Sequence, residues 1–194
     1  MTLQRYTARH KKTAYRGFVS LDVYDVTLSD GERVVETVRE VHDHGHGSAI
    51  LPYDAARCTC LLVRQMRMPV HVVEGDGHII EAAAGLIDPE DNGPEDTAVR
   101  EAGEELGHRV HNPERVATVY PIPGLVTEQI NCYLASYSPS DRIEGGGEAD
   151  EDEVLEVIEW PLSRAWQAVE TGEIRDAKTL ILLQALKLRR GDLF

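Results

Sequence analysis

The sequence has little of what marks a membrane or secreted protein. No apolar run among its 194 residues approaches the roughly 18 needed to span a bilayer. The start of the chain, MTLQRYTARHKK, is polar and lacks the apolar centre of a secretory signal. We therefore expect no membrane association and a cytoplasmic protein.

Cysteine is scarce as well. Cys58 and Cys60 stand two apart on a strand-like run, so both should point to the same face and should not pair. Cys132 would be left over in any case, and a structural zinc site would need a second ligand pair that the sequence lacks. We expect three reduced, part-buried thiols.

Positive charge is the third scarcity. The chain has 20 Lys and Arg against 34 Asp and Glu, which gives a formal net charge of −14. This balance argues against a nucleic-acid partner, because a phosphate backbone is bound by clustered Lys and Arg. A small anion remains compatible, provided that metal ions and a few arginines reverse the field locally.

Mixed strands with few helices, one of them central, indicate an α+β fold or an α/β/α sandwich with a mixed sheet. Residues 17–41 alternate around Asp30-Gly31, which predicts an antiparallel hairpin. Asn92 or Gly93 should cap a helix that Pro94 begins and Gly107 ends. We expect an N-terminal strand and hairpin region over 1–46 and the main domain over 47–194. Further strands are predicted at 48–53, 58–65, 78–83, 115–122, 129–137 and 154–160, and helices at 163–171 and 177–189.

The central helix carries the clearest chemistry. Glu101, Glu104 and Glu105 stand at i, i+3 and i+4, and therefore on one helix face. Like charges at these spacings destabilise an isolated helix by roughly a few tenths of a kcal/mol per pair. Arg100 can offset part of this cost by pairing with Glu104. Clustered carboxylates are the ligands that hard divalent cations require. The alternative is a solvated acidic face with no ligand.

The residues around this helix resemble the Nudix hydrolase family. The family pattern is a Gly, five residues, a Glu, seven residues, then Arg-Glu, a hydrophobic residue, any residue, Glu-Glu, any residue and Gly. Two departures occur: the interval from Gly85 to Arg100 is one residue longer, and His108 replaces the final hydrophobic residue. The middle Glu position falls on Asp91, with Glu90 and Glu95 as alternatives. The matching residues are Gly85, Arg100, Glu101, Ala102, Glu104, Glu105 and Gly107.

The resemblance covers nearly the whole chain and extends to pyrophosphatases that act on ADP-ribose and GDP-mannose. Tyr15-Arg16-Gly17-Phe18 is similar to the ADP-ribose enzymes. Several segments are more similar to the GDP-mannose enzymes, namely Arg39-Glu40-Val41, Arg64–Arg67, Pro123–Glu128, Gly145–Gly147, Glu151–Glu153 and Thr171–Thr179. The resemblance implies hydrolysis of the diphosphate bond of a nucleoside-diphosphate sugar, with GDP-mannose favoured over ADP-ribose. A non-catalytic nucleotide-sugar sensor is the alternative from a different class.

The resemblance also implies a set of site residues. Mg²⁺, for which Mn²⁺ could substitute, would be held by Glu101, Glu105 and the carbonyl of Ala84, with Glu81 and Glu153 as further ligands. Glu104 would serve as a ligand or as the partner of Arg100, and Glu151 is the candidate general base. Substrate contacts are implied for Arg39, Glu40, Arg67, Gly85, Leu86, Glu128, Asp152 and Lys178. The early hairpin would be exchanged between two subunits of a homodimer.

One competing pattern is weaker. His42, His44 and His46 alternate in HDHGHG, which could suggest zinc. The glycines between them are more typical of a turn, so we do not predict a metal site there.

Overall fold

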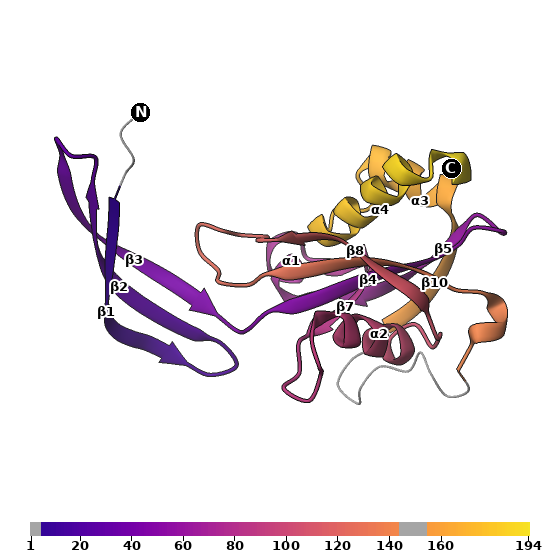
Figure 1. Ribbon diagram of the computed structural model, residues 1–194, viewed down its shortest axis with the longest axis horizontal. Coiled ribbons are helices and arrows are strands. Elements are labelled where there is room, and N and C mark those ends of the chain that lie inside the picture. Colours follow the sequence, from indigo (N-terminus) through magenta and orange to yellow (C-terminus); the bar gives the residue numbers. More distant parts are fainter. Residues whose placement is uncertain (1–4, 144–154) are drawn as a thin grey trace. The chain divides into compact units, whose positions relative to one another are not determined.

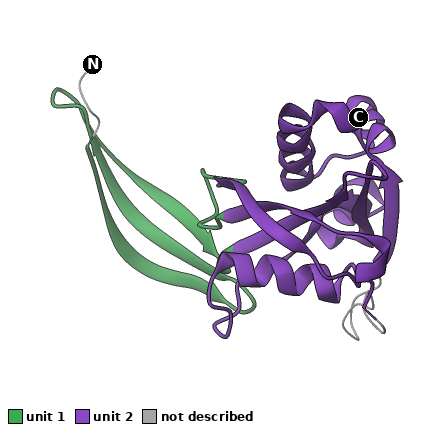
Figure 2. Cartoon of the chain, turned by 45° about the vertical axis from the view of Figure 1, so that its right-hand side comes forward, with its two compact units in different colours: residues 1–46, 120–129 green, residues 47–119, 130–194 purple. Residues whose placement is uncertain are grey.

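The structure is a computed structural model that describes residues 5–143 and 155–194. The chain divides into two compact units, which Figure 2 shows in green and purple. The first unit comprises Met1–His46 with Tyr120–Gln129, and the second comprises Gly47–Val119 with Ile130–Phe194. The segment 120–129 therefore joins the N-terminal unit, although it lies far along the sequence.

The first unit is a three-stranded antiparallel sheet in the order β1-β2-β3 (Figure 1). Its strands are β1 (Arg5–Arg16), β2 (Ser20–Ser29) and β3 (Val34–Asp43). The predicted hairpin at Asp30-Gly31 is confirmed. Gly31 has φ 95°, and the Asp30 carboxylate accepts hydrogen bonds from the backbone N–H groups of Glu32 and Arg33 at 3.1 and 2.8 Å.

The N-terminal region was expected to hold a strand, but the bounds of β1 were not predicted, because RYTARHKKTAYR has no apolar alternation, and almost all of its residues are exposed. Cross-strand polar pairs align it with β2 instead. Lys11 Nζ lies 2.9 Å from Asp25, and the Thr13 hydroxyl donates to Asp22 at 2.6 Å. Long-range pairing of this kind leaves no local sequence signal.

The second unit is built on a seven-stranded mixed sheet. Its main order is β10-β5-β4-β9-β8, with β6 paired to β5 and β7 paired to β4. Strands β4 and β9 run parallel, and the other pairs are antiparallel. The strands are β4 (Gly47–Asp54), β5 (Thr59–Met66), β6 (His78–Glu81), β7 (Ala83–Leu86), β8 (His111–Val119), β9 (Ile130–Ser136) and β10 (Leu155–Pro161).

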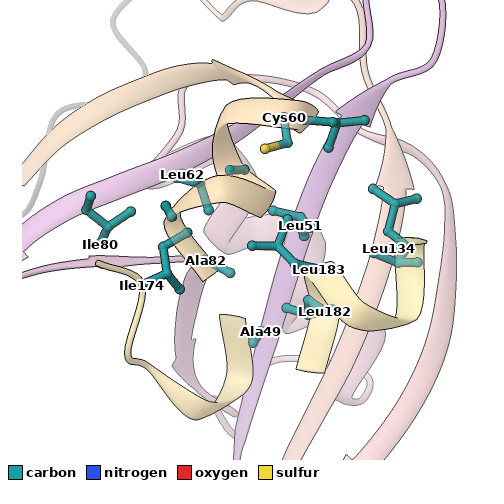
Figure 3. Close-up of a cluster of buried hydrophobic side chains, with 14 of the residues drawn as sticks. Ala49, Leu51, Cys60, Leu62, Ile80, Ala82, Leu134, Ile174, Leu182 and Leu183 are labelled. Atoms are coloured by element: carbon teal, nitrogen blue, oxygen red, sulfur yellow. The ribbon is translucent and has the colours of Figure 1, made fainter. Parts of the chain in front are cut away.

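Helices cover both faces of this sheet, so the predicted α/β/α sandwich is confirmed (Figure 1). Helix α2 (Pro94–Glu104) packs on one face around Ile50, Leu61 and Ala98. Helices α3 (Leu162–Thr171) and α4 (Ala177–Arg189) pack on the other face, where Leu182 and Leu183 lie over Leu51 and its neighbours (Figure 3). The remaining helical segments are α1 (Met68–Glu74), η1 (Pro139–Asp141) and η2 (Gly191–Leu193). None of the described helices combines the length and apolar character needed to cross a bilayer.

Two local predictions were wrong. The run at 78–83 is not one strand but two short ones, β6 and β7, separated at Ala82. Strands β4 and β5 pair with each other only at Tyr53–Cys60 and Asp54–Thr59. The segment 78–86 therefore pairs first with β5, through β6, and then with β4, through β7. Cys58 lies in the turn before β5, at φ 53°, and does not share a strand with Cys60. All three cysteines are free, and Cys60 and Cys132 are fully buried.

Candidate active site

Helix α2 presents two glutamates to strand β7. Gly93 caps the helix and Pro94 occupies its first turn, as the sequence predicts. Glu101 and Glu105, one turn apart, are both buried. The backbone N–H of Ala84 donates to Glu105 Oε2 at 3.1 Å, so the Glu105 carboxylate is fixed against β7. The helix and the strand therefore meet at the residues to which the resemblance assigns the metal.

Gly85 gives Glu101 its place beside the same strand. A Cβ at position 85 would lie 1.8 Å from Glu101 Oε1 and 2.3 Å from Glu101 Cδ. Real Cβ atoms essentially never come this close to another heavy atom, so any other residue would displace the carboxylate. The Gly85 backbone does not adopt a positive φ. Glycine is required here by the close approach of Glu101 and not by backbone conformation.

Arg100 organises the acidic cluster. Its guanidinium lies 2.6 Å from Glu104 Oε2, 2.8 Å from Glu101 Oε1 and 3.3 Å from Asp91 Oδ2. It also donates to the carbonyl oxygen of Leu86 at 3.3 Å. The predicted Arg100–Glu104 pair is confirmed, which favours the partner role for Glu104. A single guanidinium faces three carboxylates, so the local charge stays negative and attracts cations.

Asp91 occupies the uncertain middle position of the acidic pattern. The Thr97 hydroxyl donates to Asp91 Oδ2 at 2.7 Å, and Arg100 contacts the same carboxylate. These bonds, with that of Thr97 first, lower the pKa of Asp91. Through these hydrogen bonds Asp91 connects the loop between β7 and α2 to helix α2.

Glu101 has the opposite electrostatic balance. Burial raises the pKa of Glu101, and the negative charge of Glu104 raises it further, while Arg100 opposes both. A buried carboxylate with a raised pKa is stabilised by a cation, because the ion replaces the lost hydration. The Glu101 site is suited to an added positive charge.

Glu81 lies in a second charged cluster at the end of β6. It is 2% exposed, and its carboxylate accepts from Arg67 Nε at 2.7 Å, from Arg67 Nη2 at 3.2 Å and from Lys178 Nζ. Lys178 Nζ also lies 3.1 Å from Asp176 Oδ1. Burial alone would raise the pKa of Glu81, but Arg67 and Lys178 outweigh it and hold the pKa below its ordinary value. The structure thus brings together three residues that the sequence analysis assigned separately.

The donor chemistry fits a divalent cation at β7 and α2. Glu101 and Glu105 supply carboxylate oxygen atoms beside the backbone of Ala84 and Gly85, and oxygen atoms are the ligands that Mg²⁺ and Mn²⁺ prefer. Within residues 5–143 and 155–194, no three Asp, Glu, His or Cys side chains converge as a closed cage would require.

Other predicted site residues belong to the first unit or lie outside the described residues. Arg39, on β3, donates to the Thr37 hydroxyl at 2.8 Å and to the Val38 carbonyl at 2.9 Å, and the neighbouring Glu40 is exposed. Glu128 Oε1 lies 3.5 Å from His44 Nε2. Glu151, Asp152 and Glu153 fall in the range 144–154, outside the described residues. The roles of all these residues stay predictions.

Sequence reasoning gave no role to Thr179 and Asp176. Thr179 is fully buried, and its hydroxyl accepts a hydrogen bond from the backbone N–H of Ala82 at 2.7 Å. Asp176 caps α4 by accepting from the N–H of Thr179 at 2.9 Å. An Asp three residues before a Thr at a helix start was a readable capping signal. The contact with Ala82, across 97 positions, had no such signal.

The chain is similar to several known proteins. Residues 44–183 match the model of the NUDIX domain family. The chain is 47% identical over 167 residues to the GDP-mannose pyrophosphatase of Cronobacter sakazakii, covering 86% of this chain and 85% of that protein. A protein with the same name from Escherichia coli strain SMS-3-5 is 44% identical over 165 residues, with 84% of each chain covered.

A solved structure of an ADP compounds hydrolase has a TM-score of 0.79. The match covers 99% of this chain and 97% of that chain at 21% identity, and therefore shows a shared fold.

Proposed function

We propose that this chain, which belongs to the Nudix family, hydrolyses the diphosphate bond of a nucleoside-diphosphate sugar, GDP-mannose in preference to ADP-ribose. One observation carries the proposal: Glu101 and Glu105 meet the backbone of Ala84-Gly85, where only glycine leaves room for the Glu101 carboxylate. The products would be a nucleoside monophosphate and a sugar phosphate. The names of the relatives at 43–47% identity support GDP-mannose as the preferred substrate.

The two clusters divide the work of phosphoryl transfer. Glu101 and Glu105, with the carbonyl of Ala84, would hold Mg²⁺, for which Mn²⁺ could substitute. When bound, such an ion polarises phosphoryl oxygens and lowers the pKa of a bound water. Arg67 would bind the diphosphate, because its planar guanidinium can donate two parallel hydrogen bonds to phosphate oxygens. Lys178 adds a second positive charge beside it.

The acidic site must be neutralised before a diphosphate can approach. Like charges about 4 Å apart repel by roughly 4 kcal/mol at an effective dielectric near 20. Glu81 holds Arg67 and Lys178 close together. Both cations are therefore already positioned before the substrate binds, and binding does not have to order their side chains. We assign water activation to Glu151 or Glu153, and further substrate contacts to Asp152, Gly85, Leu86, Arg39, Glu40 and Glu128.

Turnover assays test the proposal directly. GDP-mannose and ADP-ribose are compared by kcat/KM with Mg²⁺, and EDTA should abolish both rates. Replacement of Glu105 by Gln should lower kcat by about 10²-fold or more, since a metal ligand is lost while the side-chain volume is kept. Absence of turnover for both substrates in the wild-type protein would refute the proposal. Binding without turnover would favour a sensor.

We further propose a cytoplasmic homodimer with exchanged N-terminal strands. The three-stranded sheet buries Val23 and Val26, yet Tyr6, Val34 and Val38 on the same sheet are 65%, 65% and 47% exposed. A hollow of about 610 Å³ on this sheet is lined by residues 7–9, 25–27 and 36–38. Tyr6 is in register with Val35, so it lies on the opposite face from Val34 and Val38, and apolar side chains are exposed on both faces of the sheet. A second copy of the chain would bury such side chains. Sedimentation at micromolar concentration should give a dimer, and a fully active monomer would contradict this.

A further inference from the structure

The strand that carries the active-site backbone changes partners at Ala82. Strand β6 ends with Glu81 opposite Val63 of β5, and β7 begins with Ala83 opposite Ile50 of β4. Ala82 lies between them and belongs to neither strand. It is 1% exposed, so its backbone N–H must find a partner inside the protein.

Thr179 on helix α4 provides that partner. Its hydroxyl oxygen accepts from the Ala82 N–H at 2.7 Å and donates its proton to Asp176 Oδ2 at 2.6 Å. A hydroxyl that both donates and accepts has a fixed orientation. Asp176 is itself fixed, because it caps α4 through the Thr179 N–H and contacts Lys178. The crossover at Ala82 is therefore tied to the start of α4.

The residues on either side of the crossover belong to the candidate active site. Glu81 directly precedes Ala82 and gathers Arg67 and Lys178. Ala84 and Gly85 lie two and three positions after Ala82 and set the positions of Glu105 and Glu101. A displacement of Ala82 would move both clusters, since Glu81, Ala84 and Gly85 lie within three positions of it.

We propose that Thr179 is a positioning residue for phosphoanhydride hydrolysis, with Asp176 as its anchor. The hydroxyl of Thr179 fixes the position of the Ala82 backbone and thereby the spacing between the Glu81 cluster and the Glu101–Glu105 site. The catalytic consequence rests on the proposed function. The structural part, that Thr179 holds segment 78–86 in place, stands independently.

The test compares Thr179→Val, which removes the hydroxyl at nearly constant volume, with Thr179→Ser, which retains it. Thr179→Val should lower kcat on the order of 10²-fold, the effect of a misplacement of about 1 Å. KM should rise as well, because Arg67 and Lys178 move with the crossover, and Thr179→Ser should restore both kcat and KM to within about threefold of wild type. Amide hydrogen exchange of segment 78–86 should accelerate in the Val variant only.

Thr59→Val is the matched control. Thr59 is also a buried threonine in this unit, and its hydroxyl bonds to Tyr137 at 2.9 Å, away from the crossover. This variant should lose thermal stability while keeping kcat and the exchange of segment 78–86. An equal loss of kcat in Thr59→Val would show a general effect of destabilisation and overturn the proposal, as would a wild-type kcat in Thr179→Val.

Asp176→Asn gives a second route if Thr179→Val does not fold. The amide retains an oxygen acceptor for the cap, but the anchor loses its charge, so exchange at 78–86 should accelerate and kcat should fall by about tenfold. Unchanged exchange and unchanged kcat would overturn the proposal. Should the wild-type protein turn over neither sugar nucleotide, the proposed function fails, whereas the exchange measurements still decide whether Thr179 holds the crossover.

Discussion

Replacement of Gly85 by alanine should separate catalysis from stability. The added methyl carbon would lie 1.8 Å from Glu101 Oε1, and the Glu101 carboxylate must retreat by more than about 1 Å to restore a 3.0 Å separation. The strand itself need not change, because the Gly85 backbone has no positive φ. The steric conflict therefore falls on one functional group.

The expected loss of rate follows from this displacement. A misplacement of about 1 Å costs on the order of 10²-fold in rate, which corresponds to about 2.7 kcal/mol in the activation barrier. The free energy of unfolding should change by no more than about 1 kcal/mol, since the atom in conflict is the end of a side chain. Steady-state kinetics with Mg²⁺ and GDP-mannose, alongside thermal unfolding, measure both quantities.

Two further variants control the experiment. Gly103→Ala adds a methyl group to helix α2, which carries Glu101, and the nearest neighbour of that methyl group would be Ile143 Cδ1 at an ordinary 3.5 Å. It should keep kcat and stabilise the protein by about 0.5–1 kcal/mol, as alanine does within a helix. Glu101→Asp added to Gly85→Ala shortens the acid and should recover part of the rate. A wild-type kcat in Gly85→Ala would refute the proposed role of the contact.

Three other measurements probe the charged and buried groups. Lys178→Met should lower the free energy of unfolding by about 3 kcal/mol, because it removes one of two cations from the buried Glu81, and chemical denaturation checks this. Arg57→Leu should lower Tm at pH 7 but not in acid. The hydrogen bond from Arg57 lowers the pKa of Glu159, although burial opposes it. The stabilisation by this pair is therefore fully present above pH 4.5 and is lost as the pH falls through the lowered pKa of Glu159. A Tm difference that persists in strong acid would contradict that assignment. A thiol reagent at pH 8 should modify Cys58 quickly and the other two cysteines only after unfolding, because burial raises the pKa of Cys60 to about 12 and that of Cys132 to about 11.

The central helix was predictable because its determinants are local. The cap at Gly93, Pro94 in the first turn and the spacing of Glu101, Glu104 and Glu105 all act within a few residues. The same holds for the hairpin at Asp30-Gly31. The Arg100–Glu104 pair followed from helical geometry alone.

Other features depended on segments that meet only after folding. Strand β1 is defined by its pairing with β2, and the break at Ala82 by the divergence of β4 from β5. The sequence analysis named Glu81, Arg67 and Lys178 as site residues but could not join them, since Glu81 lies 14 positions from Arg67 and 97 from Lys178.

The sequence by itself determined the family, the central helix and the acids that this helix presents, because periodicity and capping act over short distances along the chain. Only the tertiary structure decided that Gly85 makes room for Glu101 and that Thr179 supports Ala82. Those contacts join residues far apart in sequence, and their geometry is set by packing against the sheet, which no local pattern encodes.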